Sequence, residues 1–331
     1  MEVIKYTNEW EFSWDKFVIE DSYNGTFLQT RIFLNYHSSN RFVDASVLIV
    51  EGEEIVAVVP ACVVWDDGKK IFYSHKGSTF GGVIINKKYN DLKTTLEILD
   101  VLEEHFICKK YNQIILKITS DLFSESDCSL LQYLLYMKGY EEYLELSSYI
   151  DLKKIETPED IITNMSKNKR RDIKIALKSQ LVFRKIVEKD EVKDFYSLLE
   201  KNLRKFGAKP IHTVEEILDL RDNRMRGKLS LYGVYKGEKI LSGAMVFLFN
   251  ENIAHTQYLA HDLDEKKYYA MNYMYYSLIL EAVQKGQKIL SWGISSTNFG
   301  KMLNYNLARF KEDQGSTFAV NRTFYKSFCN E

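Results

Sequence analysis

The chain has 331 residues, longer than the commonest single-domain size and sufficient for two domains that each bury a core. Hydrophobic residues make up 45% and charged residues 27%, which is ordinary for a soluble globular protein. The formal net charge is −1, which argues against nucleic acid bound along the whole surface and leaves room only for a local basic patch.

Targeting and cysteine patterns predict a cytoplasmic protein. The N-terminal stretch is charged and aromatic and lacks the apolar core of a secretory signal, and no run reaches the ~18 apolar residues that a membrane span needs. The four cysteines form no CxxC motif and have no histidine at metal-ligand spacing: Cys62, Cys108, Cys128 and Cys329. We therefore expect the cysteines to be reduced and to serve mostly as packing residues, and we expect no metal site.

The first half of the chain predicts a three-strand meander followed by helix, strand, helix and strand. Gly52, in VLIVEGEEI, would supply the positive φ of a hairpin turn. A leucine-lined face predicts a helix near Asp91 to Phe106, and a second helix is expected near Ser129 to Lys138. The expected strands are VLIVEGEEI (two arms of a hairpin), AVVPACVVW, IFYSH, NQIILKI (112–118) and YLELSSYIDL (143–152).

A helical stretch, 158–226, is expected between the halves, with Gly207 and Gly227 where helix C-caps are expected. The second half then repeats the order of the first. Gly237 matches Gly52, and helices are expected near 271–284 and 301–311. The expected strands are YGVYKGEKI (two arms of a hairpin), LSGAMVFLF, IAHTQYLAH, KILSWGI and STFAVNRTFY. The repeated order indicates duplication and an α/β (α+β) fold with mixed sheets, divided into residues 1–151 and 152–331.

Six segments in this order and spacing resemble the FemABX family of tandem acyltransferase-fold proteins and the related FemAB-like acetyltransferases. They are LQT (28–30), FYSHKGSTFGG (72–82), NMSKNKRRDIKIALK (164–178), LRKFGAKPI (203–211), MNYMYYSLILEAVQKGQKILSWGIS (271–295) and LARFKEDQG (307–315). The resemblance covers most of the chain and implies two tandem GNAT-like domains, each a mixed, mostly antiparallel sheet flanked by helices. It also implies transfer of an acyl group to an amine.

Two departures from the family pattern concern the acceptor. The armless branch of the family carries a phosphate-binding lysine after the early Gln segment, whereas this chain has IFLNYHSSN, with Tyr36 and His37. That branch also carries an acid after the first buried strand, where this chain has Thr119, with Asp121 two residues on. Both departures speak against a UDP-muropeptide acceptor and leave the fold unaffected.

Transfer to an amine requires that the amine is neutral and that a group accepts its proton. It also requires a hydrogen-bond donor that stabilises the tetrahedral intermediate. No Ser-His-Asp or Cys-His signature is evident, so we expect direct transfer. Lys311, in the closing Phe-Lys motif, is implied by the resemblance to contact the donor or the oxyanion; its alternative is a solvated lysine at a helix end. Tyr258 is a further catalytic candidate, and His261, at a strand end, is the general-base candidate. His255 would share the face of Tyr258 only if a bulge intervened.

Donor phosphates are expected at the N-terminus of the helix that begins near Met271, because helix N-termini favour anions. The candidate donor-binding residues there are Lys267, Tyr269 and Asn272, together with Lys311. A plain helix start is the alternative. The Gly-rich pyrophosphate loop of simple acetyltransferases is missing, which argues against an acyl-CoA donor without excluding it.

Candidate acceptor-binding residues lie in the loop HKGSTFGG and at the end of a helix in the middle of the chain. In the loop, Gly81 and Gly82 would permit close approach of a ligand, and His75 and Lys76 would meet phosphate or sugar; a glycine turn needed only for chain reversal is the alternative. By resemblance, Arg204 or Lys205 would contact the acceptor.

A basic patch is expected on the helix NMSKNKRRDIKIALK, whose only acid is Asp172; its members are Lys167, Lys169, Arg170, Arg171 and Lys174. It could bind tRNA phosphates, a phosphorylated acceptor or an anionic membrane face, or it could be a solvated helix face.

The sequence thus predicts an N-acyltransferase that acts on an amine of a cell-envelope precursor, a muropeptide or an amino sugar. Its donor would be aminoacyl-tRNA or acyl-CoA, used as a co-substrate with no cofactor tightly bound. The alternatives are a non-catalytic tRNA- or RNA-binding module and a scaffold of an envelope-synthesis complex.

Overall fold

A computed structural model describes residues 1–37, 41–205 and 207–328. The chain folds into two compact units, which are described separately: unit 1 comprises 1–145 with 320–331, and unit 2 comprises 146–319. The sequence placed the boundary after residue 151 and gave the whole C-terminal part to the second domain. In the structure the boundary lies six residues earlier, and the last strand belongs to unit 1 from residue 320 onward. None of the described helices is long and apolar enough to cross a membrane.

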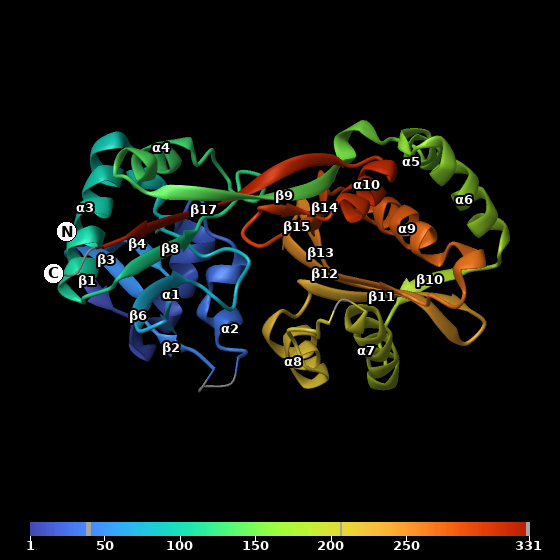
Figure 1. The fold of residues 1–331 in the computed structure, drawn as a ribbon, viewed down its shortest axis with the longest axis horizontal. Coiled ribbons are helices and arrows are strands. Elements are labelled where there is room, and N and C mark those ends of the chain that lie inside the picture. Colours follow the sequence, from blue (N-terminus) through green and yellow to red (C-terminus); the bar gives the residue numbers. More distant parts are fainter. Residues whose placement is uncertain (38–40, 206, 329–331) are drawn as a thin grey trace. The chain divides into compact units, whose positions relative to one another are not determined.

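Unit 1 contains two groups of strands covered by helices (Figure 1). Its strands are β1 (Glu2–Lys5), β2 (Val43–Asp44), β3 (Val47–Glu51), β4 (Glu54–Val59), β5 (Cys62–Asp66), β6 (Lys69–Ser74), β7 (Ile84–Ile85), β8 (Gln113–Lys117), the first part of β9 (Glu141–Asp151) and the last part of β17 (Thr317–Ser327). Its helices are α1 (Glu11–Lys16), α2 (Arg31–Leu34), α3 (Leu92–Cys108) and α4 (Ser129–Met137). The predicted helices 91–106 and 129–138 are thereby confirmed.

The expected three-strand meander of the first half is wrong in detail. The run AVVPACVVW is divided at Pro60 and Ala61 into β4 and β5, which pair in different sheets. Proline has no N–H for a ladder, and the Ala61 N–H bonds the Ser46 hydroxyl 3.0 Å away instead of a strand partner. The chain therefore changes sheets here: β3 and β4 pair with β1 and β7, whereas β5 continues to β6, which runs parallel to β8.

Unit 2 contains the second copy of the predicted order. Its strands are the last part of β9, β10 (Val182–Lys185), β11 (Leu229–Lys236), β12 (Lys239–Asn250), β13 (Ile253–His261), β14 (Ile289–Ile294), β15 (Ser296–Thr297), β16 (Met302–Leu303) and the first part of β17. Its helices are α5 (Pro158–Asn164), α6 (Lys167–Lys178), α7 (Lys189–Arg204), α8 (Val214–Asp219), α9 (Ala270–Gln284) and α10 (Tyr305–Asp313). The expected helical stretch 158–226 also contains a strand, β10, which the sequence analysis missed.

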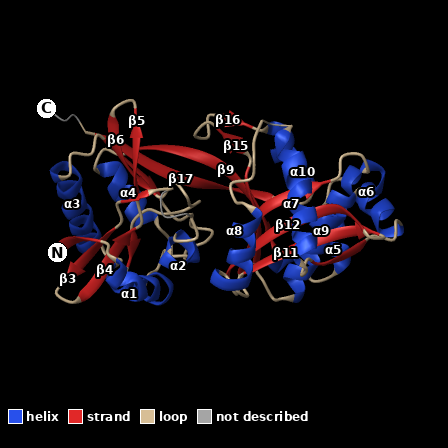
Figure 2. Cartoon of the chain, turned by 90° about the horizontal axis from the view of Figure 1, so that it is seen from below, coloured by secondary structure: helices blue, strands red, loops and turns tan. Residues whose placement is uncertain are grey.

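The sheet of unit 2 has helices on both faces (Figures 1 and 2). Its strand order is β10-β11-β12-β13-β14-β9. Helix α9 packs its buried side chains against one face, whereas α7 packs against β12 and β13 on the other. Gly243 of β12 lies directly under Phe195 of α7: a Cβ there would be only 2.3 Å from a ring carbon. A glycine is thus required at this point for α7 to lie close to the sheet.

The closing strand of each half pairs in the other unit. The residues of β9 from 147 to 151 pair antiparallel with β14 in unit 2, and the residues of β17 from 323 to 327 pair antiparallel with β8 in unit 1. Each unit therefore has the same local order, in which a parallel pair, β6 with β8 or β13 with β14, is extended by a strand from the other half. This agrees with the predicted fold class, a mixed and mostly antiparallel α/β architecture in two tandem copies.

Candidate active site

The parallel strands of unit 2 pair over a short distance and then separate. β13 and β14 are in register at three positions, ending with His255 opposite Ser291. Beyond this point β13 pairs only with β12, and β14 continues beside β9 with a register shift at Trp292. Gly293 has a φ of +70°, a left-handed conformation that favours glycine. Backbone groups are therefore freed from the sheet ladder where β14 leaves β13.

Lys311 lies at this point of separation. It projects from α10, and its Nζ donates hydrogen bonds of 2.9 Å to the carbonyl oxygens of Gly293 and Ile294. The side chain is only 3% exposed, and burial lowers the pKa of its amine to about 7. The structure therefore places the leading candidate of the sequence analysis as a buried amine on the freed carbonyls, and not as a solvated lysine.

His255 is a second buried group beside Lys311, and the sequence analysis did not select it. Its Nδ1 lies 3.0 Å from the Ser291 hydroxyl, and a Cβ on Gly293 would lie 3.3 Å from the ring. Burial, with a contribution from the positive charge of Lys311, lowers the pKa of His255 to about 4. The imidazole is therefore neutral at pH 7.

A β-bulge decides which face Tyr258 occupies. The register of β12 with β13 shifts so that Met245 opposes Tyr258 whereas Val246 opposes Thr256, which leaves one extra residue on β13. Because of this bulge, His255 and Tyr258 lie on the same face of the strand. Regular alternation along the strand would have placed them on opposite faces.

The Tyr258 hydroxyl contacts a loop between α7 and α8, not a catalytic histidine. It accepts a hydrogen bond from the Ile211 N–H at 3.1 Å and lies 2.7 Å from Nδ1 of His212. Burial raises the pKa of Tyr258 to about 12, so the phenol is protonated at pH 7. His212 is buried and was not selected from the sequence.

His261, the predicted general base, lies at the far end of β13. Its backbone is held by the Asn202 amide, which bonds both its carbonyl oxygen, at 2.8 Å, and its N–H, at 3.3 Å. Burial, followed by the charges of Lys205 and Lys266, lowers the pKa of the imidazole. The structure thus brings His261 together with Lys205; Arg204 is also exposed, at the end of α7.

The N-terminus of α9 has no side-chain cap. Tyr269 precedes the helix with a φ of 52°, and its side chain makes no capping hydrogen bond to the first N–H groups. Lys267 is exposed nearby and forms an ion pair of 3.6 Å with Glu265. Two of the candidate donor-binding residues therefore lie at an uncapped helix start, which attracts anions.

Asn272, the third candidate at this helix start, is buried in a polar network. Its Oδ1 accepts from the Gln314 amide at 2.8 Å and from Nζ of Lys169 at 3.4 Å, and its amide donates to Asp172 at 3.4 Å. Lys169 also lies 4.3 Å from the centre of the Phe310 ring. The network joins α6, α9 and the end of α10, so Lys169 faces inward, unlike the rest of the predicted basic patch.

The other members of the basic patch lie on the outward face of α6. Lys167, Arg170, Arg171 and Lys174 are exposed, and they line an open hollow together with Ile175 and Lys178. Asp172 lies between Lys169 and Arg171, at 4.0 Å and 3.2 Å. The outward face of α6 is therefore strongly basic on a chain that is nearly neutral.

The glycine loop of unit 1 is folded against its own strands. A Cβ on Gly81 would lie 2.5 Å from the Ser74 backbone, and Gly82, with a φ of +75°, would meet the Ile118 backbone at 2.9 Å. His75 is 5% exposed, and burial lowers its pKa to about 3. Lys76 is exposed. The two glycines thus have a packing reason for their identity.

The early glutamine and the threonine that departs from the family pattern are hydrogen-bonded to each other. The Gln29 amide donates to the Thr119 hydroxyl at 2.9 Å and to the Gly81 carbonyl at 3.3 Å, and its oxygen accepts from Thr26. Gln29 is completely buried, so this contact fixes the loop.

Two predictions concern residues that the structure does not describe. Residues 38–40 of the stretch IFLNYHSSN lie outside the described residues, and so does Cys329. The described cysteines are free thiols: Cys62, Cys108 and Cys128.

Unit 1 also holds a buried lysine that the sequence analysis missed. Lys117, at the end of β8, donates to the Ser78 carbonyl, and burial lowers the pKa of its amine to about 8 despite the nearby Glu145 carboxylate. The position of this lysine within the apolar run NQIILKI was the sequence signal for its burial.

Among the described residues, no group of three or more His, Cys, Asp or Glu could hold a metal ion.

Comparisons with known proteins identify the fold. No protein-family model and no curated protein matches the chain. Among solved structures, FemX matches with a TM-score of 0.72 at 13% identity, covering 99% of this chain and 98% of that one. L-PGS from Bacillus licheniformis has a TM-score of 0.60 at 11% identity, covering 98% and 94%. A tandem GNAT protein from the clavulanic acid biosynthesis pathway has a TM-score of 0.53 at 8% identity, covering 98% of each chain. The predicted resemblance is confirmed in fold: the chain is a tandem GNAT-fold protein with the architecture of FemX.

Proposed function

We propose that the protein is an N-acyltransferase that moves an acyl or aminoacyl group from an activated donor to an amine of a cell-envelope precursor, a muropeptide or an amino sugar. The reacting centre would lie in unit 2, where β13 and β14 separate. The fold of FemX supports this class of reaction, and the position of Lys311 is the observation that carries it.

Lys311 can supply the hydrogen-bond donor that stabilises a tetrahedral intermediate. A protonated lysine has three N–H groups, and two of them bond the carbonyls of Gly293 and Ile294. The third has no partner among the described residues, so it is available for the oxygen that becomes negative during acyl transfer. Such a donor, held in place before the reaction, is worth about 2.7–4 kcal/mol in comparable sites.

His255 would support Lys311 without competing with it. Its low pKa keeps the ring neutral, so no second positive charge adjoins the lysine, and it holds a proton too weakly to serve as the resting base. We therefore assign His255 a positioning role beside Ser291 and Gly293. His261 lies six residues further along β13, roughly 20 Å away in an extended strand, so we assign it no role at this centre.

The donor would be aminoacyl-tRNA or acyl-CoA, used as a co-substrate and not tightly bound. The uncapped N-terminus of α9, with Lys267 and Tyr269, supports binding of donor phosphates there. Within unit 2, Arg204 and Lys205 are the proposed acceptor-binding residues. His75, Lys76, Gly81 and Gly82 stay a separate prediction for unit 1. The basic face of α6 favours tRNA, because its exposed cations suit a phosphate backbone.

The same basic face supports a second function, that of a tRNA- or RNA-binding module without transfer activity. That module would bind RNA with a steep dependence on salt and would acylate no amine. The contacts of Lys311 speak against it, because RNA binding does not need a buried amine on freed carbonyls.

Thermal-shift titrations with acetyl-CoA and, separately, with uncharged tRNA test the donor at two salt concentrations. A ligand that binds only the folded state raises the melting temperature as its concentration exceeds Kd. A CoA shift that persists in high salt would support an acyl-CoA donor. A salt-sensitive shift with tRNA alone would exclude acetyl-CoA as the donor, and transfer of the aminoacyl group to an amine would then separate the aminoacyl-tRNA branch from the RNA-binding module. No shift with either ligand would contradict the proposal.

A further inference from the structure

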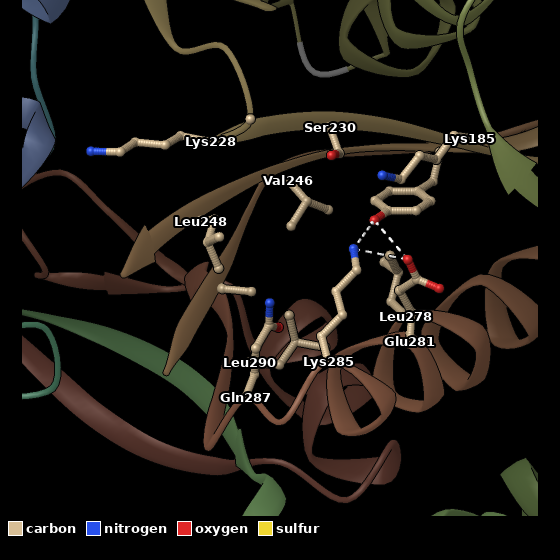
Figure 3. Close-up of a pocket in the computed structure, with 14 residues that line it drawn as sticks. Lys185, Lys228, Ser230, Val246, Leu248, Leu278, Glu281, Lys285, Gln287 and Leu290 are labelled. Atoms are coloured by element: carbon tan, nitrogen blue, oxygen red, sulfur yellow. Dashed lines mark hydrogen bonds and ion pairs between the residues drawn. The ribbon is translucent and has the colours of Figure 1, made fainter. Parts of the chain in front are cut away.

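Unit 2 contains a second hollow, which lies between the C-terminal half of α9 and the sheet (Figure 3). Its volume is about 260 Å³, close to the lower limit for small-molecule sites. The lining comes from β10, β11, β12, β13, α9 and the start of β14, all within unit 2. None of the residues assigned to the transfer centre lines it.

The floor of this pocket is aliphatic. Six apolar side chains form it: Val246, Leu248, Ala254, Leu278, Ala282 and Leu290. No aromatic ring and no charged group belongs to this part of the lining. An aliphatic chain that lies on this floor is removed from water. Each methylene buried in this way raises the affinity by about fourfold.

One end of the pocket is polar and ordered. The buried Tyr232 donates to Oε1 of Glu281 at 3.2 Å and accepts from Nζ of Lys285 at 2.9 Å, and Lys285 and Glu281 form an ion pair of 2.8 Å. Burial tends to raise the pKa of the Glu281 carboxyl, but the Lys285 contact and the charge of Lys185 outweigh it, and the pKa is lowered. The carboxylate is therefore ionised and its charge is matched by Lys285.

Lys185 brings a further positive charge to this end, where Glu281 is the acidic residue of the lining. Among the described residues Lys185 has no ion-pair partner, and neither has Lys228. In Figure 3, Lys185 on β10 and Lys285, the residue after the end of α9, direct their amines toward the same end of the pocket, whereas Lys228 points away from them. The pocket thus combines an aliphatic floor with a net positive charge at one end.

We propose that this pocket binds an aliphatic carboxylate of medium chain length, with the carboxylate beside Lys185 and Lys285 and the chain on the floor of Val246, Leu248 and Leu290. This ligand is distinct from the acyl donor and the amine acceptor of the proposed reaction, and the site does not depend on that reaction. An aliphatic amine would add a third positive charge beside Lys185 and Lys285, against the single carboxylate of Glu281 in the lining, and a short carboxylate would leave the floor empty.

Isothermal titration of the full chain with butyrate, hexanoate and octanoate tests the proposal. The affinity is expected to rise by about fourfold per methylene until the floor is covered. Octanoate is expected to bind more tightly than octylamine or octanol, because only the carboxylate complements the lysines. Equal affinity for octanoate and octylamine, or no dependence on chain length, would overturn the proposal.

The variant Lys185→Gln locates the carboxylate. Lys185 is exposed on the edge strand β10, so its replacement is expected to leave the fold unchanged, which thermal unfolding checks. Octanoate affinity should fall by about three- to fivefold, and octanol affinity should not change. The matched control Lys93→Gln, an exposed lysine of unit 1, should bind octanoate as the wild type does. Equal octanoate affinity in Lys185→Gln and Lys93→Gln would contradict the placement.

Discussion

Lys311 is a buried amine whose hydrogen bonds go to backbone carbonyls. Among the described residues no acidic side chain forms an ion pair with it, and burial is the cause of its lowered pKa. A carboxylate partner would have raised the pKa instead. The amine therefore changes its protonation state near neutral pH, which gives it a measurable signature in stability as well as in activity.

The variant Lys311→Met should change how stability depends on pH. An unfolded lysine has a pKa near 10.4, and the folded value is about 7. Between these values the unfolded chain holds one more proton, so this residue makes the free energy of unfolding rise with pH, by up to about 1.4 kcal/mol per unit. Urea unfolding from pH 7 to pH 9 should show a shallower rise in Lys311→Met than in the wild type.

The exposed lysine Lys301, on the loop before α10, provides the control for this measurement. Lys301→Met should keep the slope of the wild type. If Lys311→Met also keeps that slope, the buried amine does not titrate in this window and the proposed environment of Lys311 is wrong.

Tyr258→Phe should destabilise the loop between α7 and α8. The phenol oxygen contacts the Ile211 N–H and His212, and its loss leaves these groups without that partner. The expected cost is about 1 kcal/mol in the free energy of unfolding, measured by urea denaturation. Tyr305→Phe, at a tyrosine that is 67% exposed, should change it by less than about 0.5 kcal/mol. Equal effects of the two substitutions would show that the contact contributes nothing.

The sequence predicted the site residues that belong to a motif. It did not predict the residues whose position depends on a β-bulge. Lys311 was selected from its Phe-Lys motif, and the structure shows its burial. His255 was passed over because strand periodicity places it opposite Tyr258, and a bulge of one residue reverses that relation. Alternation along a strand cannot predict a bulge, since the extra residue, Gln257, has no distinctive chemistry.

Elements were predictable where turn chemistry and periodicity agreed. Gly52 and Gly237 have φ values of 61° and 59°, as the expected hairpin turns require. The strand β10 was missed because it is four residues long between helices and its outward residues are charged. Pro60 was a readable signal for the division between β4 and β5, because proline interrupts a ladder.

Gly243→Ala should destabilise the packing of α7 on the sheet. The added methyl would lie 2.3 Å from a carbon of Phe195, which is fully buried, so ring or helix must move. The expected cost is about 1–3 kcal/mol in the free energy of unfolding. In a Phe195→Leu background the same substitution should cost less, because the ring is absent. A cost that is equal in both backgrounds would contradict this contact as the cause.

At the scale of the whole molecule, the charge of the chain is nearly balanced but unevenly distributed. The net charge is −1, yet the outward face of α6 is strongly basic. Any binding of RNA should therefore depend on this face and not on the average charge.

The double variant Lys167→Ala/Lys174→Ala should weaken tRNA binding and reduce its dependence on salt. Each lost phosphate contact lowers the slope of log K against log salt by about one, so the slope should fall by about two. Fluorescence anisotropy at several salt concentrations measures it. The control Lys93→Ala/Lys153→Ala removes two exposed lysines elsewhere and should keep the slope. The same slope in all three proteins would show that tRNA does not use α6.

The exchange of closing strands could not be predicted from the sequence. YLELSSYIDL and STFAVNRTFY were both predicted as strands and are found as β9 and β17, but local pattern does not say which partner a strand chooses. Both strands close a half with the same order of elements, so that order does not predict the exchange. The domain boundary predicted after residue 151 assumed that each half keeps its own last strand.

The most direct test of the account is a transfer assay with radiolabelled acetyl-CoA and, separately, radiolabelled alanyl-tRNA, using muropeptides and amino sugars as acceptors. The wild type should label an amine with one of these donors, and Lys311→Met should lose at least about a hundredfold in kcat while remaining folded and binding the donor. Lys301→Met should retain full activity. A folded Lys311→Met that transfers as fast as the wild type would show that Lys311 does not stabilise the reacting acyl group.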